Sequence, residues 1–79
     1  MSASIFYRPL RGSQHIPVST PSRFITAMDS VFGCQPWKLD DSSVPFLKGM
    51  ASVSDDGAPY VAIMAKIAEL GPIEVWPEW

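Results

Sequence analysis

The chain of 79 residues has a single cysteine, Cys34, and no long apolar run. One thiol cannot form an intramolecular disulfide, which excludes the small secreted domains that disulfides hold together. No stretch approaches the roughly 18 apolar residues of a membrane-spanning helix, and residues 1–10 lack the basic and apolar segments of a signal peptide. The sequence therefore predicts a cytoplasmic protein that does not enter a membrane.

Residues that carry out chemistry are scarce as well. His15 is the one histidine, and together with Cys34 it falls far short of the clustered ligands that a metal site needs. The serines lie in no nucleophile elbow, and the five glycines are scattered rather than gathered in a phosphate-binding loop. We therefore predict no catalytic residue, no metal and no cofactor, and we expect the protein not to be an enzyme.

Basic residues are too few for a general nucleic-acid binder. Six Lys and Arg stand against eight Asp and Glu, a net charge of −2, whereas phosphate binding needs a cluster of cations. The charges also divide along the chain: up to residue 28 all are positive, and from Asp29 onward eight acids outnumber three lysines, which leaves −5. Direct nucleic-acid binding is therefore disfavoured, and the folded protein can be dipolar.

Apolar residues, by contrast, are plentiful. They make up 47% of the chain and include three Trp, four Phe and two Tyr, well above what disordered chains carry. A chain this short has material for one core only. Residues 1–79 are therefore expected to form a single domain.

The N-terminal half predicts two strands and a helix. Residues 3–10 are rich in β-forming side chains and contain a proline near their end, which suits a strand that either ends there or lies at an edge of the sheet. Residues 14–18 predict a short second strand. Segment 19–21, two hydroxyl residues followed by a proline, is typical of a helix N-terminus. Gly33 is the expected end of that helix.

The C-terminal half predicts two more helices and a closing strand. Residues 34–39 are interpreted as a connector, and the acids and hydroxyls of 40–43 predict the start of a helix that ends near Val53. A third helix is expected over 58–70. Residues 73–76 alternate with the period of a strand and are expected to pair with the first strand.

Together these elements predict the α+β class, with a small two- or three-stranded antiparallel sheet packed against three short helices. Helical spacing of apolar side chains predicts the core. The second helix should bury Val53 along with its other apolar residues. The side chains expected to be mostly buried are Phe24, Met28, Val31, Phe46, Leu47, Ile63, Met64 and Ile67.

Two features stand out as possible contact sites for a partner. Pairs of aspartates precede the second and third helices, where they either stabilise the helix dipole or present negative charge to a basic surface. Two tryptophans lie among the last four residues, and each either covers the core or anchors a partner. The candidate partner-binding residues are Asp40, Asp41, Asp55, Asp56, Glu74, Trp76, Glu78 and Trp79.

In its size, acidity, single cysteine and lack of catalytic motifs, the chain resembles the anti-CRISPR proteins of phages and mobile elements. The resemblance is one of type, and it implies a non-enzymatic inhibitor that acts in the bacterial host cytoplasm. It further implies a protein partner, whose basic nucleic-acid-binding surface the inhibitor occupies. We expect a type I Cascade effector, which would then no longer bind target DNA.

Two other functions stay open. The basic N-terminal third, with Arg8, Arg11, Arg23 and His15 beside an exposed Phe6 or Tyr7, is compatible with a small nucleic-acid-associated regulator. The tryptophan-rich C-terminal edge is compatible with an accessory phage protein that self-associates.

Overall fold

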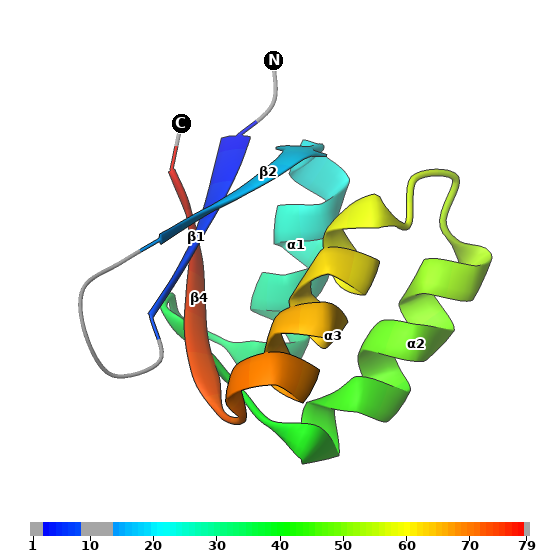
Figure 1. The fold of residues 1–79 in the computed structure, drawn as a ribbon. Coiled ribbons are helices and arrows are strands. Elements are labelled where there is room, and N and C mark those ends of the chain that lie inside the picture. Colours follow the sequence, from blue (N-terminus) through cyan, green and yellow to red (C-terminus); the bar gives the residue numbers. More distant parts are fainter. Residues whose placement is uncertain (1–2, 9–13, 79) are drawn as a thin grey trace.

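The computed structural model describes residues 3–8 and 14–78 (Figure 1). Their elements, in chain order, are β1 (Ala3–Arg8), β2 (Gln14–Thr20), α1 (Ser22–Phe32), β3 (Trp37–Leu39), the short 3-10 helix η1 (Asp41–Ser43), α2 (Val44–Val53), α3 (Ala58–Leu70) and β4 (Ile73–Glu78). Residues 9–13, between β1 and β2, lie outside the described residues.

The four strands form one antiparallel sheet in the order β2-β1-β4-β3. The first and last strands are therefore neighbours at its centre, which confirms the predicted pairing of the closing strand with the first strand. Their register sets Phe6 opposite Trp76 and Arg8 opposite Glu74. All three helices lie on one side of the sheet (Figure 1), so the α+β class is confirmed.

The fourth strand, β3, lies where the sequence was interpreted as a connector. Trp37 pairs with Val75 and Leu39 with Ile73. Both Trp37 and Leu39 are buried, while Lys38 between them is exposed. Three residues are too few for a period of two to distinguish a strand from a loop.

Most of the predicted core is confirmed. Phe24, Met28, Leu47, Ile63 and Ile67 are buried. The ring of Phe24 meets those of two other aromatic residues edge to face: Trp37 at 6.0 Å between centroids, and Tyr60 at 4.8 Å.

Val31 and Val53 were predicted to be buried and are not: their exposed fractions are 52% and 76%. The buried stripe of α1 is centred on Met28 and turns toward Ile25, which leaves Val31 at its margin. Val53, in the last turn of α2, lies away from the side that buries Leu47. Two other predicted core residues, Phe46 and Met64, are half-buried and pack against the core.

The two predicted helix starts have different outcomes. The cap predicted over 19–21 is wrong, because β2 continues through the buried Thr20, whose hydroxyl donates to the Val18 carbonyl at 3.3 Å. Pro21 takes the cap position without a side-chain hydrogen bond. The acids and hydroxyls of 40–43 do start a helix, since Asp40 and Ser43 form a capping box.

Candidate functional site: the open face of the sheet

One face of the sheet carries the core and the helices, and its other face carries no helix of the described chain (Figure 1). Alternation along each strand divides the side chains between the two faces. In β4, for example, Ile73, Val75 and Pro77 are buried and the residues between them are not. We call the helix-free side the open face. Its described members include Phe6, Arg8, His15, Lys38, Glu74, Trp76 and Glu78.

Three rings cross the open face in a row from β2 through β1 to β4. Phe6 lies between His15 and Trp76, with centroids 5.3 Å from the first and 6.2 Å from the second. The Phe6 and Trp76 rings are nearly parallel, at 18°. Phe6 and Trp76 are each half-buried although no helix covers them, because the rings cover one another. We call these three residues the aromatic row.

Charged side chains hold the aromatic row in place. The Arg8 guanidinium lies 5.5 Å from the centre of the Trp76 ring and pairs with the Glu74 carboxylate at 3.2 Å. The Trp76 indole N–H donates to Glu78 Oε2 at 2.8 Å. Because Trp76 has a cation on its ring and an acceptor on its N–H, its position is set by contacts within the sheet.

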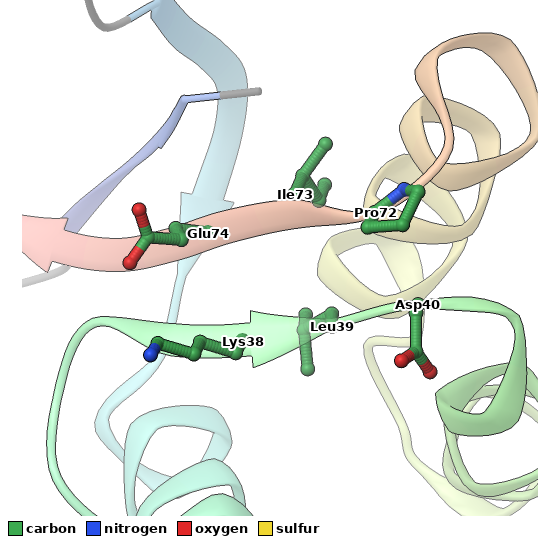
Figure 2. A pocket seen from close by; sticks show the side chains of 6 residues that line it. All are labelled: Lys38, Leu39, Asp40, Pro72, Ile73 and Glu74. Carbon is green, nitrogen blue, oxygen red and sulfur yellow. The ribbon is translucent and has the colours of Figure 1, made fainter. Parts of the chain in front are cut away.

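A small hollow is lined by residues in and beside β3 and β4 (Figure 2). It has a volume of about 220 Å³ and lies between the ends of β3 and β4. Lys38 and Glu74 line it from adjoining strands, with Asp40 beyond the end of β3 (Figure 2). Because pockets for drug-sized ligands start at about 300 Å³ and are largely apolar, this hollow is too small to be one.

Asp40 and Asp41, two of the predicted contact residues, lie at the start of η1. The carboxylate of Asp40 accepts from the Ser42 backbone N–H at 2.9 Å and from the Ser42 hydroxyl. These hydrogen bonds, the hydroxyl first, lower the pKa of Asp40. Asp40 therefore has a structural role at this helix start.

Asp55 and Asp56 lie in the connection between α2 and α3, across the helical layer from the sheet (Figure 1). Asp55 pairs with Arg23 at 3.7 Å, both side chains being largely exposed. Asp56 accepts from the backbone N–H of Ala58 at 3.2 Å, in the first turn of α3. Of this pair, only Asp56 contacts the start of a helix.

The structure thus brings together only part of the predicted set. Glu74, Trp76 and Glu78 share the open face, whereas the four aspartates lie at two other places and Trp79 lies outside the described residues. Of the two alternatives for Trp76, the indole lies on the open face and not over the helices.

The sequence did not predict that the members of the aromatic row lie together. Phe6, Arg8 and His15 were considered only as nucleic-acid contacts, separately from Trp76, and Lys38 was not predicted to contact a partner. The alternation of β1 and β4 was the available signal, since it predicts which side chains share a face. Tyr7, considered beside Phe6 as an exposed ring, is buried in the core.

The two residues best suited to chemistry lie on different elements. His15 is exposed on β2 against Phe6, and Cys34 is exposed in the loop after α1. Within residues 3–8 and 14–78, no three His, Cys, Asp or Glu side chains gather as metal ligands would. In the same part of the chain, none of the helices has the length and apolar character needed to cross a bilayer.

Comparison of the chain with protein-family models, with curated proteins and with solved structures finds no match.

Proposed function

We propose that this protein acts without chemistry, by binding a partner protein through the open face. The aromatic row carries this proposal: His15, Phe6 and Trp76 lie side by side on the helix-free side of the sheet. Trp is among the residues that most often dominate binding energy at protein interfaces, and aromatic residues and Arg are enriched there. Arg8, stacked on Trp76, adds the other favoured type.

The charges of the open face favour a protein over a nucleic acid. Arg8 and Lys38 are balanced by Glu74 and Glu78, and Arg8 is already paired with Glu74. Nucleic-acid binding depends on cations that are free to neutralise phosphates. A protein surface can offer both signs of charge around an apolar centre, which is the arrangement found here.

The resemblance to anti-CRISPR proteins makes a type I Cascade effector the first partner to test. The proposed inhibitor occupies a nucleic-acid-binding surface of that complex, so that target DNA no longer binds. Its net charge of −2, with −5 from Asp29 onward, favours approach to a basic surface. In this scheme the aspartates at the helix starts assist association, while the aromatic row supplies affinity.

Titration calorimetry against purified Cascade tests the proposal. Trp76→Ala should weaken binding by at least about 2 kcal/mol, as expected for an interface anchor. Val53→Ala is the matched control, because Val53 is 76% exposed on α2 and not on the open face. Circular dichroism melts establish that both variants are folded.

Three outcomes would contradict the proposal. If wild-type protein and Cascade do not bind, the partner is wrong. If Trp76→Ala binds as the wild type does, the open face is not the contact surface. If a single-stranded oligonucleotide binds instead and quenches tryptophan fluorescence, the nucleic-acid alternative with Arg8, His15 and Phe6 takes its place.

The absence of chemistry has its own test. Inhibition of target-DNA binding should saturate at a fixed ratio of inhibitor to Cascade, with the masses of the Cascade subunits unchanged. Cys34→Ser should inhibit as the wild type does, because the thiol is exposed in a loop apart from the open face. Turnover, a covalent change in Cascade, or loss of inhibition in folded Cys34→Ser would contradict a purely binding mechanism.

A further inference from the structure

We propose that two copies of this chain pair through their open faces. The two-fold axis lies over the open face, parallel to β1 and β4 and midway between these two strands. This goes beyond the proposed function, since it concerns the protein alone. It uses the same surface, so a second copy and a partner protein compete for the aromatic row.

The register of the central strands makes the open face self-complementary. Phe6 and Arg8 of β1 lie opposite Trp76 and Glu74 of β4 within one copy. The proposed axis lays β1 of each copy over β4 of the other, so Phe6 meets the Trp76 of the second copy and Arg8 meets its Glu74. Each contact then occurs twice, as a symmetric interface requires. Two sheets packed face to face keep their strands nearly aligned, which this axis satisfies.

The charge pattern favours a second copy over a nucleic acid. A nucleic acid would bring phosphates onto Glu74 and Glu78. With a second copy, Arg8 and Glu74 of each copy meet Glu74 and Arg8 of the other, which joins them in one network of four side chains. In that network no charge of the Arg8–Glu74 pair is left unpaired when water is excluded.

The size of the open face predicts a weak pair. Strands lie about 4.8 Å apart and rise about 3.3 Å per residue. The sheet is therefore roughly 15 Å wide across its four strands and roughly 20 Å long at β1 and β4, which have 6 residues each. That is less than the roughly 800 Å² per partner of a standard stable interface. We therefore expect a dissociation constant between about 10 µM and 1 mM for the pair, so monomers prevail at lower protein concentrations.

Sedimentation velocity over this concentration range tests the pairing. The wild-type mass should rise from that of one 8.7-kDa chain toward twice that value. Trp76→Ala should weaken association at least about tenfold. Lys48→Glu, an exposed substitution on α2, should leave it unchanged. A wild-type mass that stays monomeric up to about 1 mM would overturn the proposal.

Charge reversal tests the axis itself. Arg8→Glu makes the Arg8–Glu74 pair wholly negative and Glu74→Arg makes it wholly positive, so each variant alone should associate more weakly than the wild type. Mixed in equal amounts, the two variants should form a heterodimer at least as strong as the wild-type dimer. If both are folded by circular dichroism and the mixture stays monomeric, the axis is wrong. These results involve no Cascade, so they are separate from the test of the proposed function.

Discussion

The two faces of the sheet are built from the same strands, yet their side chains are held in different ways. On the buried face, Trp37 is fully enclosed and its indole N–H donates at 2.9 Å to Asp29, on α1. On the open face, Trp76 donates to Glu78 of its own strand, two residues away. Packing in the core fixes Trp37, whereas Trp76 is held by exposed contacts within the sheet, with Phe6, Arg8 and Glu78. The two faces of one sheet thus hold their tryptophans by different kinds of contact.

The largest expected effect is a difference in the free energy of unfolding between substitutions on the two faces. Phe24→Ala should lower the free energy of unfolding by about 3–5 kcal/mol, because it opens a cavity between Trp37 and Tyr60. Phe6→Ala should cost no more than about 1.5 kcal/mol, the value of a cross-strand aromatic pair. Urea denaturation measures both. Equal losses would mean that the open face is part of the core.

The next prediction compares the two carboxylates that accept from tryptophan N–H groups, Asp29 for Trp37 and Glu78 for Trp76. Asp29→Ala should cost about 1–3 kcal/mol, because it leaves the buried Trp37 N–H without its carboxylate acceptor. Glu78→Ala should change stability by less than about 0.5 kcal/mol, because water can replace Glu78 at the open face. If the two variants melted alike, the contrast between the buried and the exposed tryptophan would not hold.

A smaller effect depends on pH and lies at Asp40, beyond the end of β3. Hydrogen bonds from Ser42 lower the pKa of Asp40 below the ordinary value of an aspartate side chain. A lowered pKa in the folded state means that the stabilisation is present above about pH 4 and is lost as the pH falls through the folded pKa. Asp40→Asn keeps an oxygen acceptor and does not titrate. The stability difference between wild type and Asp40→Asn should therefore shrink between about pH 5 and pH 2, and a constant difference would contradict this.

The smallest effect concerns an ion pair on neither face. Arg23 and Asp55 are 72% and 88% exposed, so Arg23→Ala should change the free energy of unfolding by less than about 0.5 kcal/mol. It should also leave association unchanged. Arg8→Ala should weaken association, because Arg8 lies over the Trp76 ring. Equal effects on association would remove the special role of the open face.

Local signals predicted the helices well. The capping residues at 40–43 and the glycine–proline pair after Leu70 act within one turn, so they could be recognised in the sequence. The cap predicted over 19–21 failed because strand pairing extended β2 through Thr20. The buried end of a strand can thus take a hydroxyl residue that local preference assigns to a helix.

The open face could be predicted less well, because its contacts are not local. Arg8 and Glu74 are 66 positions apart, and no pattern within either strand says that they are neighbours. The paired aspartates were conspicuous in the sequence, yet those with assigned contacts cap helices or pair with Arg23. The sequence around His15 did not predict its place in the aromatic row, because that place depends on the Phe6 ring in the neighbouring strand.

The pairing of the first and last strands also determines how the open face can be detected. Phe6 and Trp76 form one surface only after residues from both ends of the chain have met. A peptide taken from either strand lacks half of that surface. An antibody against the native aromatic row would therefore recognise a discontinuous epitope, and it would report the folded protein while ignoring the denatured chain on a blot.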